Sequence, residues 1–269
     1  MDRRLPAAAL SLLLLLSCGD GQREDVSGTQ LFLPSAQGAV PVVVLVPGGA
    51  WTLADPSGLV PLARALADGG VLAATTTYRT ASDGVVFPAP VEDVVCAAAE
   101  VVDRAVGQGM GGGPLVLVGH SAGAQLAVVA ALRGPELVTR CRVELDGVVG
   151  LAGAYDVTAL PELATALFGV PPEEDPVLWA SGDPLEAASE RPDVPALLLH
   201  GGADGVVPES MSERLADALR RGGHRVELGL VPGEDHDSVY SPRVAAERLL
   251  TWVRALRDAE PTPVPVGSG

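Results

Sequence analysis

The sequence has few aromatic residues and few basic ones. Phe, Trp and Tyr make up only 3% of the 269 residues, so the hydrophobic core must be built mainly from Val, Leu and Ala. Lys and Arg together number 18 against 34 Asp and Glu, which gives a formal net charge of −16. A surface this acidic repels phosphate backbones and anionic lipid headgroups. The composition therefore predicts no nucleic-acid partner and no simple electrostatic adhesion to a membrane.

Cysteine is scarce as well, and its spacing excludes two kinds of site. The chain has three cysteines, at positions 18, 96 and 141. None of them belongs to a Cys-x-x-Cys pair or to a spacing typical of zinc ligands, so no metal, redox centre or other cofactor is predicted. Cys96 and Cys141 are compatible with a disulfide, as in many exported proteins, and equally with two buried free thiols.

The first 17 residues have the pattern of a secretory signal peptide. Two arginines precede a leucine-rich run that is too short to cross a bilayer comfortably. The run ends in Leu-Leu-Ser-Cys at residues 15–18, which resembles a bacterial lipobox, and this resemblance implies that Cys18 carries the lipid anchor of an exported, cell-envelope protein. An ordinary cleaved signal, leaving a secreted or periplasmic soluble protein, is the alternative. In the lipid-anchored form, residues 18–27 are expected to be a polar tether between the anchor and the folded domain.

Apolar runs typical of buried strands alternate with helical patterns along the rest of the chain. This alternation predicts one α/β domain over residues 28–258, with a mostly parallel central sheet and helices on both faces. A proline-rich segment at 154–190 breaks the rhythm and predicts a short, lid-like insert with one helix near 159–167. The proline-rich composition of residues 259–269 predicts a disordered tail. Strands are expected at 42–46, 71–77, 115–118, 143–151, 196–199 and 226–230, and helices at 58–68, 90–106, 122–132, 209–221 and 243–257.

A G-x-S-x-G motif occupies residues 119–123, with Ser121 at its centre. It follows a predicted strand and opens a predicted helix, which places the serine on a tight elbow at the carboxyl end of the strand. The glycines let strand and helix pack closely, and the helix N-terminus favours incoming negative charge. A serine that merely caps the helix is the alternative. The context favours Ser121 as a nucleophile.

Only four histidines are available as a base for Ser121. His120 abuts the serine and is expected to point away beneath the turn. His200 ends a buried strand and is expected to pack or hydrogen-bond locally, and His224 is expected in a surface turn. His236 lies in a polar loop after the last predicted strand, at the same edge of the sheet as the serine. We therefore interpret His236 as the general base.

Asp204 is the predicted partner of that base. It lies in the loop at the carboxyl end of the strand predicted at 196–199, within reach of the imidazole. The chain order Ser121, Asp204, His236 is the nucleophile, acid and base order of α/β-hydrolases. The two aspartates that flank His236 in sequence are too close along the chain to face its ring easily, and we interpret them as solvated loop charges.

A glycine-rich turn follows the strand predicted at 42–46. Backbone N–H groups in this turn, together with the N–H of Ala122, are suitably placed to hold a developing oxyanion. On its own the turn is also compatible with a plain connection between a strand and a helix. Its interpretation as an oxyanion hole therefore depends on the predicted triad of Ser121, Asp204 and His236.

From about residue 40 to residue 257 the chain resembles α/β-hydrolase serine esterases related to hormone-sensitive lipase, acetyl-xylan and feruloyl esterases, and arylformamidases. The resemblance implies that Gly49, Ala50 and Ala122 donate the N–H groups of the oxyanion hole. It rests on the motifs above and on Trp51 after the glycines, Tyr78-Arg79, Phe87-Pro88-Ala89, Glu92-Asp93-Val94 and the stretch from His200-Gly201 to Val207-Pro208.

One position departs from the pattern of that group. The turn usually reads His-Gly-Gly-Gly-Trp, whereas residues 47–51 here read Pro-Gly-Gly-Ala-Trp. Pro47 removes a hydrogen-bonding side chain, while Ala50 retains a backbone N–H. The departure therefore bears on the geometry of the turn and not on the class of reaction.

These residues predict a hydrolase that cleaves small-molecule carboxylic esters through an acyl-enzyme, without metal or cofactor. A formamide or amide hydrolase of the arylformamidase kind, using the same triad, is one alternative. A catalytically silent binding protein on the same fold is another. The sequence does not distinguish a monomer from a dimer.

Four of the nine aromatic residues fall near the expected site. Tyr155, Phe168 and Trp179 belong to the insert, and Trp51 flanks the glycine-rich turn. They are predicted to bind substrate by lining a small pocket, although filling a thin core under the insert is nearly as good an interpretation. A small pocket predicts water-soluble, short-chain acyl esters, from acetyl to butyryl, in preference to long-chain lipids.

Overall fold

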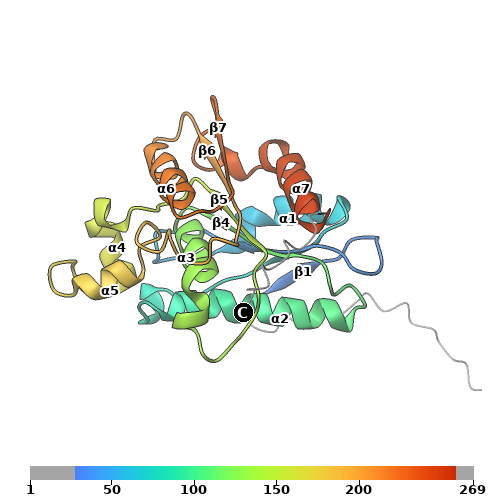
Figure 1. Ribbon diagram of the computed structural model, residues 1–269, viewed down its shortest axis with the longest axis horizontal. Helices are drawn as coiled ribbons and strands as arrows, with labels where there is room; N and C mark the ends of the chain where they lie inside the picture. The colour runs from blue at the N-terminus through green and yellow to red at the C-terminus, as the bar shows by residue number, and fades with distance from the viewer. Residues whose placement is uncertain (1–27, 259–269) are drawn as a thin grey trace, which may run out of the picture.

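The computed structural model describes residues 28–258. The predicted signal peptide, Cys18, the tether and the tail at 259–269 lie outside the described residues. The strands are β1 (Gln30–Phe32), β2 (Val42–Val46), β3 (Leu72–Thr75), β4 (Leu115–His120), β5 (Gly147–Leu151), β6 (Ala196–Gly201) and β7 (Val226–Val231) (Figure 1). The α-helices are α1 (Val60–Asp68), α2 (Ala89–Gly107), α3 (Ala122–Leu137), α4 (Pro161–Phe168), α5 (Pro176–Ser181), α6 (Ser210–Arg221) and α7 (Pro242–Asp258).

The seven strands form one sheet in the order β1-β3-β2-β4-β5-β6-β7. Every neighbouring pair is parallel except β1 and β3, which are antiparallel. The strands from β2 to β6 are completely buried, and most of their side chains are apolar on both faces. The predicted mostly parallel sheet is confirmed.

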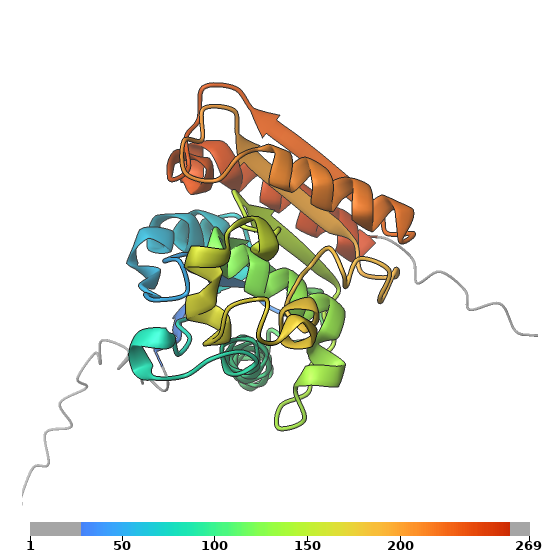
Figure 2. The same cartoon turned by 90° about the vertical axis from the view of Figure 1, so that its left-hand side faces the viewer.

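Helices cover both faces of this sheet, as predicted. Alternate residues of each strand point to opposite faces. In β2, for example, Val42, Val44 and Val46 pack in one apolar cluster with α2, α3 and α6, while Val43 and Leu45 pack in a second cluster with α1 and α7. Figure 1 shows α1 and α7 side by side on their face of the sheet, and in Figure 2 α2 is seen end-on.

Several strands differ from their predicted bounds. β3 is shorter at both ends than the predicted 71–77, and β4, β6 and β7 each end one or two residues later than predicted. The strand predicted from residue 143 begins only at Gly147, because the side chain of Asp146 accepts the backbone N–H of Leu115 at 2.8 Å and so replaces a strand partner. β1 was not predicted. It is a three-residue edge strand, too short to show a hydrophobic period.

The insert at 154–190 contains two α-helices, α4 and α5, where one was predicted. It packs against the start of α2, because the N–H of Phe87 donates to the carbonyl of Leu167 at 2.7 Å. Phe168 lies between two other rings, 5.5 Å from that of Phe87 and 4.4 Å from that of Trp179. In Figure 2 the insert lies beside α3, and Arg133 of α3 donates to the carbonyl of Ala180 at 2.7 Å.

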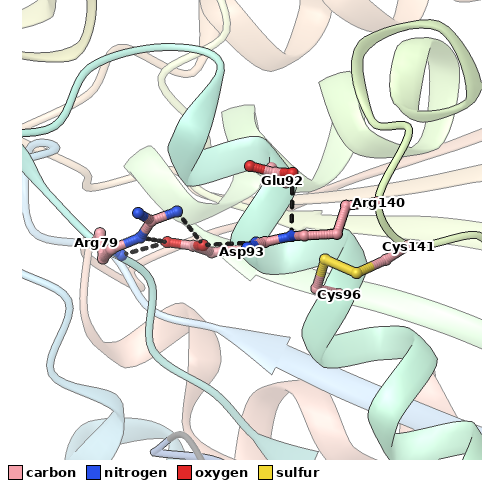
Figure 3. Close-up of a disulfide and its surroundings, with 6 residues drawn as sticks. All are labelled: Arg79, Glu92, Asp93, Cys96, Arg140 and Cys141. Carbon is pink, nitrogen blue, oxygen red and sulfur yellow. Dashed lines mark hydrogen bonds and ion pairs between the residues drawn. A yellow bond between two sulfur atoms is a disulfide. The ribbon is translucent and has the colours of Figure 1, made fainter.

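Cys96 and Cys141 form a disulfide, which settles the alternative that the sequence left open. The bridge joins α2 to the irregular segment between α3 and β5. Close to it, Arg140 lies 3.2 Å from a carboxylate oxygen of Glu92 and 3.8 Å from one of Asp93 (Figure 3). The middle of the chain is therefore fastened to the first half of α2 by a covalent bond and by charge.

No helix within residues 28–258 is long and apolar enough to cross a membrane.

Candidate active site

Four loops meet at the carboxyl edge of the sheet. They follow β2, β4, β6 and β7, whose carboxyl ends lie together because the strands are parallel and in register. The loops surround a cavity of about 360 Å³. Its lining residues are Pro47, Gly48, Gly49, Ala50, Leu53, Asp55, Gly58, Leu59, His120, Ser121, Val206, His236, Asp237 and Tyr240.

Ser121 stands on a strained elbow between β4 and α3. Its φ of 53° lies in the left-handed region, which a side chain other than that of glycine rarely adopts. A Cβ atom on Gly119 would collide with the backbone of Gly123, and one on Gly123 would collide with the carbonyl of Pro47. Both glycines are therefore needed for the close approach of strand, helix and the turn after β2.

His236 and Asp204 form a hydrogen-bonded pair. The Nδ1 atom of His236 lies 2.8 Å from Oδ2 of Asp204, whose side chain is only 1% exposed. The other carboxylate oxygen, Oδ1, accepts the backbone N–H groups of Val206 and Val207 at 2.8 and 2.9 Å. Burial opposes ionisation of Asp204, but the hydrogen bonds from His236, Val207 and Val206 outweigh it and hold its pKa below the usual range. Asp204 is thus an ionised, immobile acceptor that fixes the ring of His236.

Ser121 and His236 line the same cavity, but no hydrogen bond joins their side chains in the described part of the chain. In free enzymes the bond between nucleophile and base is often long, and it shortens when substrate binds. The structure therefore brings together the three residues predicted to form the triad and leaves the Ser121 hydroxyl open to the cavity.

His200 hydrogen-bonds locally, as predicted. Its Nδ1 lies 2.7 Å from Oγ of Ser212, and its Nε2 lies 2.9 Å from the carbonyl of Val207 and 3.2 Å from Oδ2 of Asp204. Because both neighbours of Nε2 are acceptors, that nitrogen carries the hydrogen. His200 thereby helps to hold the carboxylate of Asp204 in place.

The predictions for the other two histidines were wrong. His120 does not point away, because it lines the cavity with its ring centroid 4.7 Å from that of His236 and its Nε2 2.9 Å from the carbonyl of His236. Burial, together with the nearby His236, lowers the pKa of His120 to about 4, so that it remains neutral at physiological pH. His224 is buried, with Nδ1 2.8 Å from the carbonyl of Val194. The residues next to a histidine in the sequence do not determine the direction of its side chain. The environments of His120 and His224 could therefore not be predicted from the sequence.

The turn after β2 has an unusual backbone and free N–H donors. Gly49, Ala50 and Trp51 are three successive residues with positive φ, at 132°, 51° and 59°. Within the described chain, the backbone N–H groups of Gly49, Ala50 and Ala122 have no hydrogen-bond acceptor. Unpaired donors beside Ser121 are what an oxyanion hole requires.

The four aromatic residues predicted to bind substrate do not line the cavity. Trp51, Tyr155, Phe168 and Trp179 are each at most 2% exposed. Trp51 donates through Nε1 to Oε1 of Gln125 at 2.9 Å, while the other three fill the core beneath the insert. Their assignment to the substrate pocket is therefore corrected, and no residue of the insert belongs to the cavity wall.

Other residues that the sequence analysis did not single out form the outer wall. Leu53 and Val206 are largely exposed apolar side chains, and Tyr240 packs edge-on against His120 with ring centroids 4.6 Å apart. Asp55 and Asp237 add two exposed carboxylates, and no basic side chain lines the cavity apart from its histidines. Their positions in the sequence, next to the glycine-rich turn or in and beside the loop of His236, could have indicated that they line the site. No group of three or more potential metal ligands occurs among residues 28–258.

A parallel sheet with a serine on an elbow after one central strand, an acid after a later strand and a histidine after the last defines the α/β-hydrolase fold. The BD-FAE family model matches residues 29–219, so the chain belongs to the BD-FAE family. This confirms the predicted resemblance to α/β-hydrolase esterases.

Relatives of known name are esterases. The chain is 30% identical over 223 residues to a probable isoprenylcysteine α-carbonyl methylesterase of Oryza sativa, an alignment that covers 74% of this chain and 52% of the relative. It is 30% identical over 212 residues to Esterase LipQ of Mycobacterium tuberculosis, covering 73% of this chain and 50% of that protein. The chain thus spans about half the length of the curated relatives it matches.

The fold is also that of solved esterases. A truncated carbohydrate esterase from gut microbiota superposes with a TM-score of 0.74 at 18% sequence identity, covering 86% of this chain and 91% of that one.

Proposed function

We propose that this protein is a serine hydrolase that cleaves carboxylic esters through the triad Ser121, His236 and Asp204. The observation that supports this most strongly is that His236, which lines the same cavity as Ser121, is paired with the buried, ionised Asp204. The names of the family's relatives agree with ester hydrolysis.

In the proposed mechanism Oγ of Ser121 attacks the ester carbonyl while Nε2 of His236 takes its proton. Asp204 holds the ring through Nδ1 and stabilises the imidazolium that forms. The N–H groups of Gly49, Ala50 and Ala122 hold the negative charge on the carbonyl oxygen. The tetrahedral intermediate then collapses: the ester C–O bond breaks, and His236 gives its proton to the leaving oxygen, which releases the alcohol and leaves an acyl-enzyme. Water, deprotonated by His236, then attacks the acyl-enzyme, which releases the acid and restores Ser121.

The proposed substrates are water-soluble esters with short, uncharged acyl groups. The cavity volume of about 360 Å³ lies at the lower end of the range for small-molecule sites, roughly 300–1,000 Å³. The carboxylates of Asp55 and Asp237 repel an anionic substrate. Small size is thus supported by the cavity itself rather than by the aromatic residues from which it was first predicted.

We expect kcat/KM to peak between acetyl and butyryl esters and then to fall. Each methylene that fits is worth about 0.8 kcal/mol, and the gain stops where the wall begins. The measurement is kcat/KM for p-nitrophenyl esters from acetate to palmitate, with the mono-p-nitrophenyl ester of succinate as the anionic comparison. Steadily rising values through decanoate would contradict a bounded cavity. Faster cleavage of N-formylkynurenine or of an isoprenylcysteine methyl ester would instead assign the protein to formamides or to the substrate that the plant relatives are named for.

We also propose that Cys18 is the lipid-modified first residue of the mature protein and that the protein acts in the cell envelope. The disulfide between Cys96 and Cys141 supports export, because disulfides persist in oxidising compartments. Mass spectrometry of the mature N-terminus in a bacterial host should find a lipid-modified Cys18, and Cys18→Ser should block processing or release the protein from membranes. A mature chain that starts elsewhere would contradict the proposal.

A further inference from the structure

We infer that Tyr78 is a positioning residue that holds the oxyanion turn, defined here as residues 47–54, in its active shape. The inference depends on the proposed ester hydrolysis and concerns the same site. The contact that carries it is the hydrogen bond from Tyr78 Oη to the carbonyl of Pro47, at the start of this turn.

The oxyanion turn needs support from outside itself. Gly48 and Gly49 are adjacent, and glycine has more backbone freedom than any other residue. Ala50 and Trp51 have positive φ, which costs energy for residues with a side chain. Left alone, such a turn would populate several conformations, and only one of them directs the N–H groups into the cavity.

A bracing segment, residues 77–82, supplies that support along the whole length of the turn. Its hydrogen bonds with the turn are donated to carbonyl oxygens. Tyr78 Oη donates to Pro47 at 3.1 Å, the N–H of Ala81 to Trp51 at 3.1 Å, Ser82 Oγ to Thr52 at 2.7 Å, and Thr77 Oγ1 to Ala54 at 2.6 Å. Thr80 Oγ1 lies 3.2 Å from the same Thr52 carbonyl, but its nearer acceptor is Oδ2 of Asp83 at 3.0 Å.

The restraints on the carbonyl groups determine where the N–H groups point. In a planar trans peptide the C=O of one residue and the N–H of the next point in opposite directions. Tyr78 fixes the peptide plane between Pro47 and Gly48, directly before the plane that carries the N–H of Gly49. The carbonyl of Gly49 accepts the N–H groups of Thr52 and Leu53, each at 3.0 Å, which directs the N–H of Ala50 the opposite way.

Tyr78 is itself firmly held. It is 4% exposed, and burial raises the pKa of its hydroxyl, which therefore remains a donor. The next residue, Arg79, donates to Asp93 of α2 through its backbone N–H at 2.9 Å and through Nε and Nη2 at 2.8 Å each. Figure 3 shows this anchor beside the disulfide, with Arg140 reaching the same carboxylate. The bracing segment thus connects the oxyanion turn to a rigid helix.

Tyr78→Phe tests the inference, because it removes one buried oxygen and nothing else. We expect kcat to fall about tenfold with KM unchanged within a factor of two, since loss of a whole oxyanion donor costs about 10²–10³-fold and a loosened donor costs less. The inhibition constant of a short-chain trifluoromethyl ketone, which forms a tetrahedral adduct with the serine, should rise by the same factor as kcat falls. A purely structural role would not produce that match.

Tyr155→Phe is the matched control. Its hydroxyl is equally buried but has no hydrogen-bond partner among the described residues, so kcat should stay unchanged. Ser82→Ala, which removes the hydrogen bond from the bracing segment to the carbonyl of Thr52, should lower kcat about threefold with the same KM. Unchanged kcat in both Tyr78→Phe and Ser82→Ala, with wild-type protein active, would overturn the inference. Failure of the proposed function would look different, because wild-type protein would then hydrolyse no ester.

Discussion

Replacement of Ser121 by alanine is expected to lower ester hydrolysis by about 10⁴-fold or more. In the proposed mechanism the Ser121 hydroxyl is the only group that forms a covalent bond with the substrate. Without it, the residual catalysis comes only from substrate binding and from the oxyanion hole. The fold should not change, because the Ser121 side chain makes no hydrogen bond in the described structure and alanine accepts the same φ about as well. The measurement is kcat with p-nitrophenyl butyrate, together with the thermal midpoint.

Ser210→Ala is the control for this variant. Ser210 is an exposed serine at the start of α6, away from the cavity lining, and its loss should leave kcat unchanged. A Ser121→Ala protein that kept most of its activity at an unchanged midpoint would exclude Ser121 as the nucleophile.

Asp204→Asn is expected to lower kcat by about 10³-fold or more, with little change in KM. An asparagine retains an Oδ1 atom for the N–H groups of Val206 and Val207, so the loop should keep its shape. It cannot supply the negative charge that stabilises the imidazolium, and its amide favours the wrong tautomer of His236. Because the pKa of Asp204 is held below its usual range, the charge is present throughout the range in which a histidine base works.

A second aspartate provides the matched control for Asp204→Asn. Asp175 caps α5 by accepting the N–H of Leu178 at 2.9 Å, and asparagine is an equally good cap. Asp175→Asn should therefore retain both kcat and the thermal midpoint. If Asp204→Asn were as active as this control, the acid of the triad would have to be another residue.

Most of the fold was predictable because the strands are buried on both faces. The run Val42–Val46 forms β2 with the predicted bounds, and α3 begins at Ala122 as predicted. Two of the differences depend on tertiary contacts. Asp146 shortens β5 by accepting a hydrogen bond from another strand, and β1 exists only as an edge added to β3.

The site was predictable where chain order and strand topology decide position. Ser121, Asp204 and His236 follow different parallel strands, and the carboxyl ends of such strands share one edge of the sheet. The direction of a side chain is not decided that way. Trp51 and the aromatic residues of the insert point into the core, whereas His120 points toward the cavity, and only packing determines which of these occurs.

Ser121, as a nucleophile activated by His236, should react covalently with an alkyl fluorophosphonate. Wild-type protein and Ser121→Ala are treated with the reagent, and their peptides are examined by mass spectrometry. We expect one phosphonyl adduct, on Ser121, that appears in step with loss of esterase activity and is absent from the variant. Wild-type protein that took up no reagent, or that carried the adduct on another residue while losing activity, would contradict this role of Ser121.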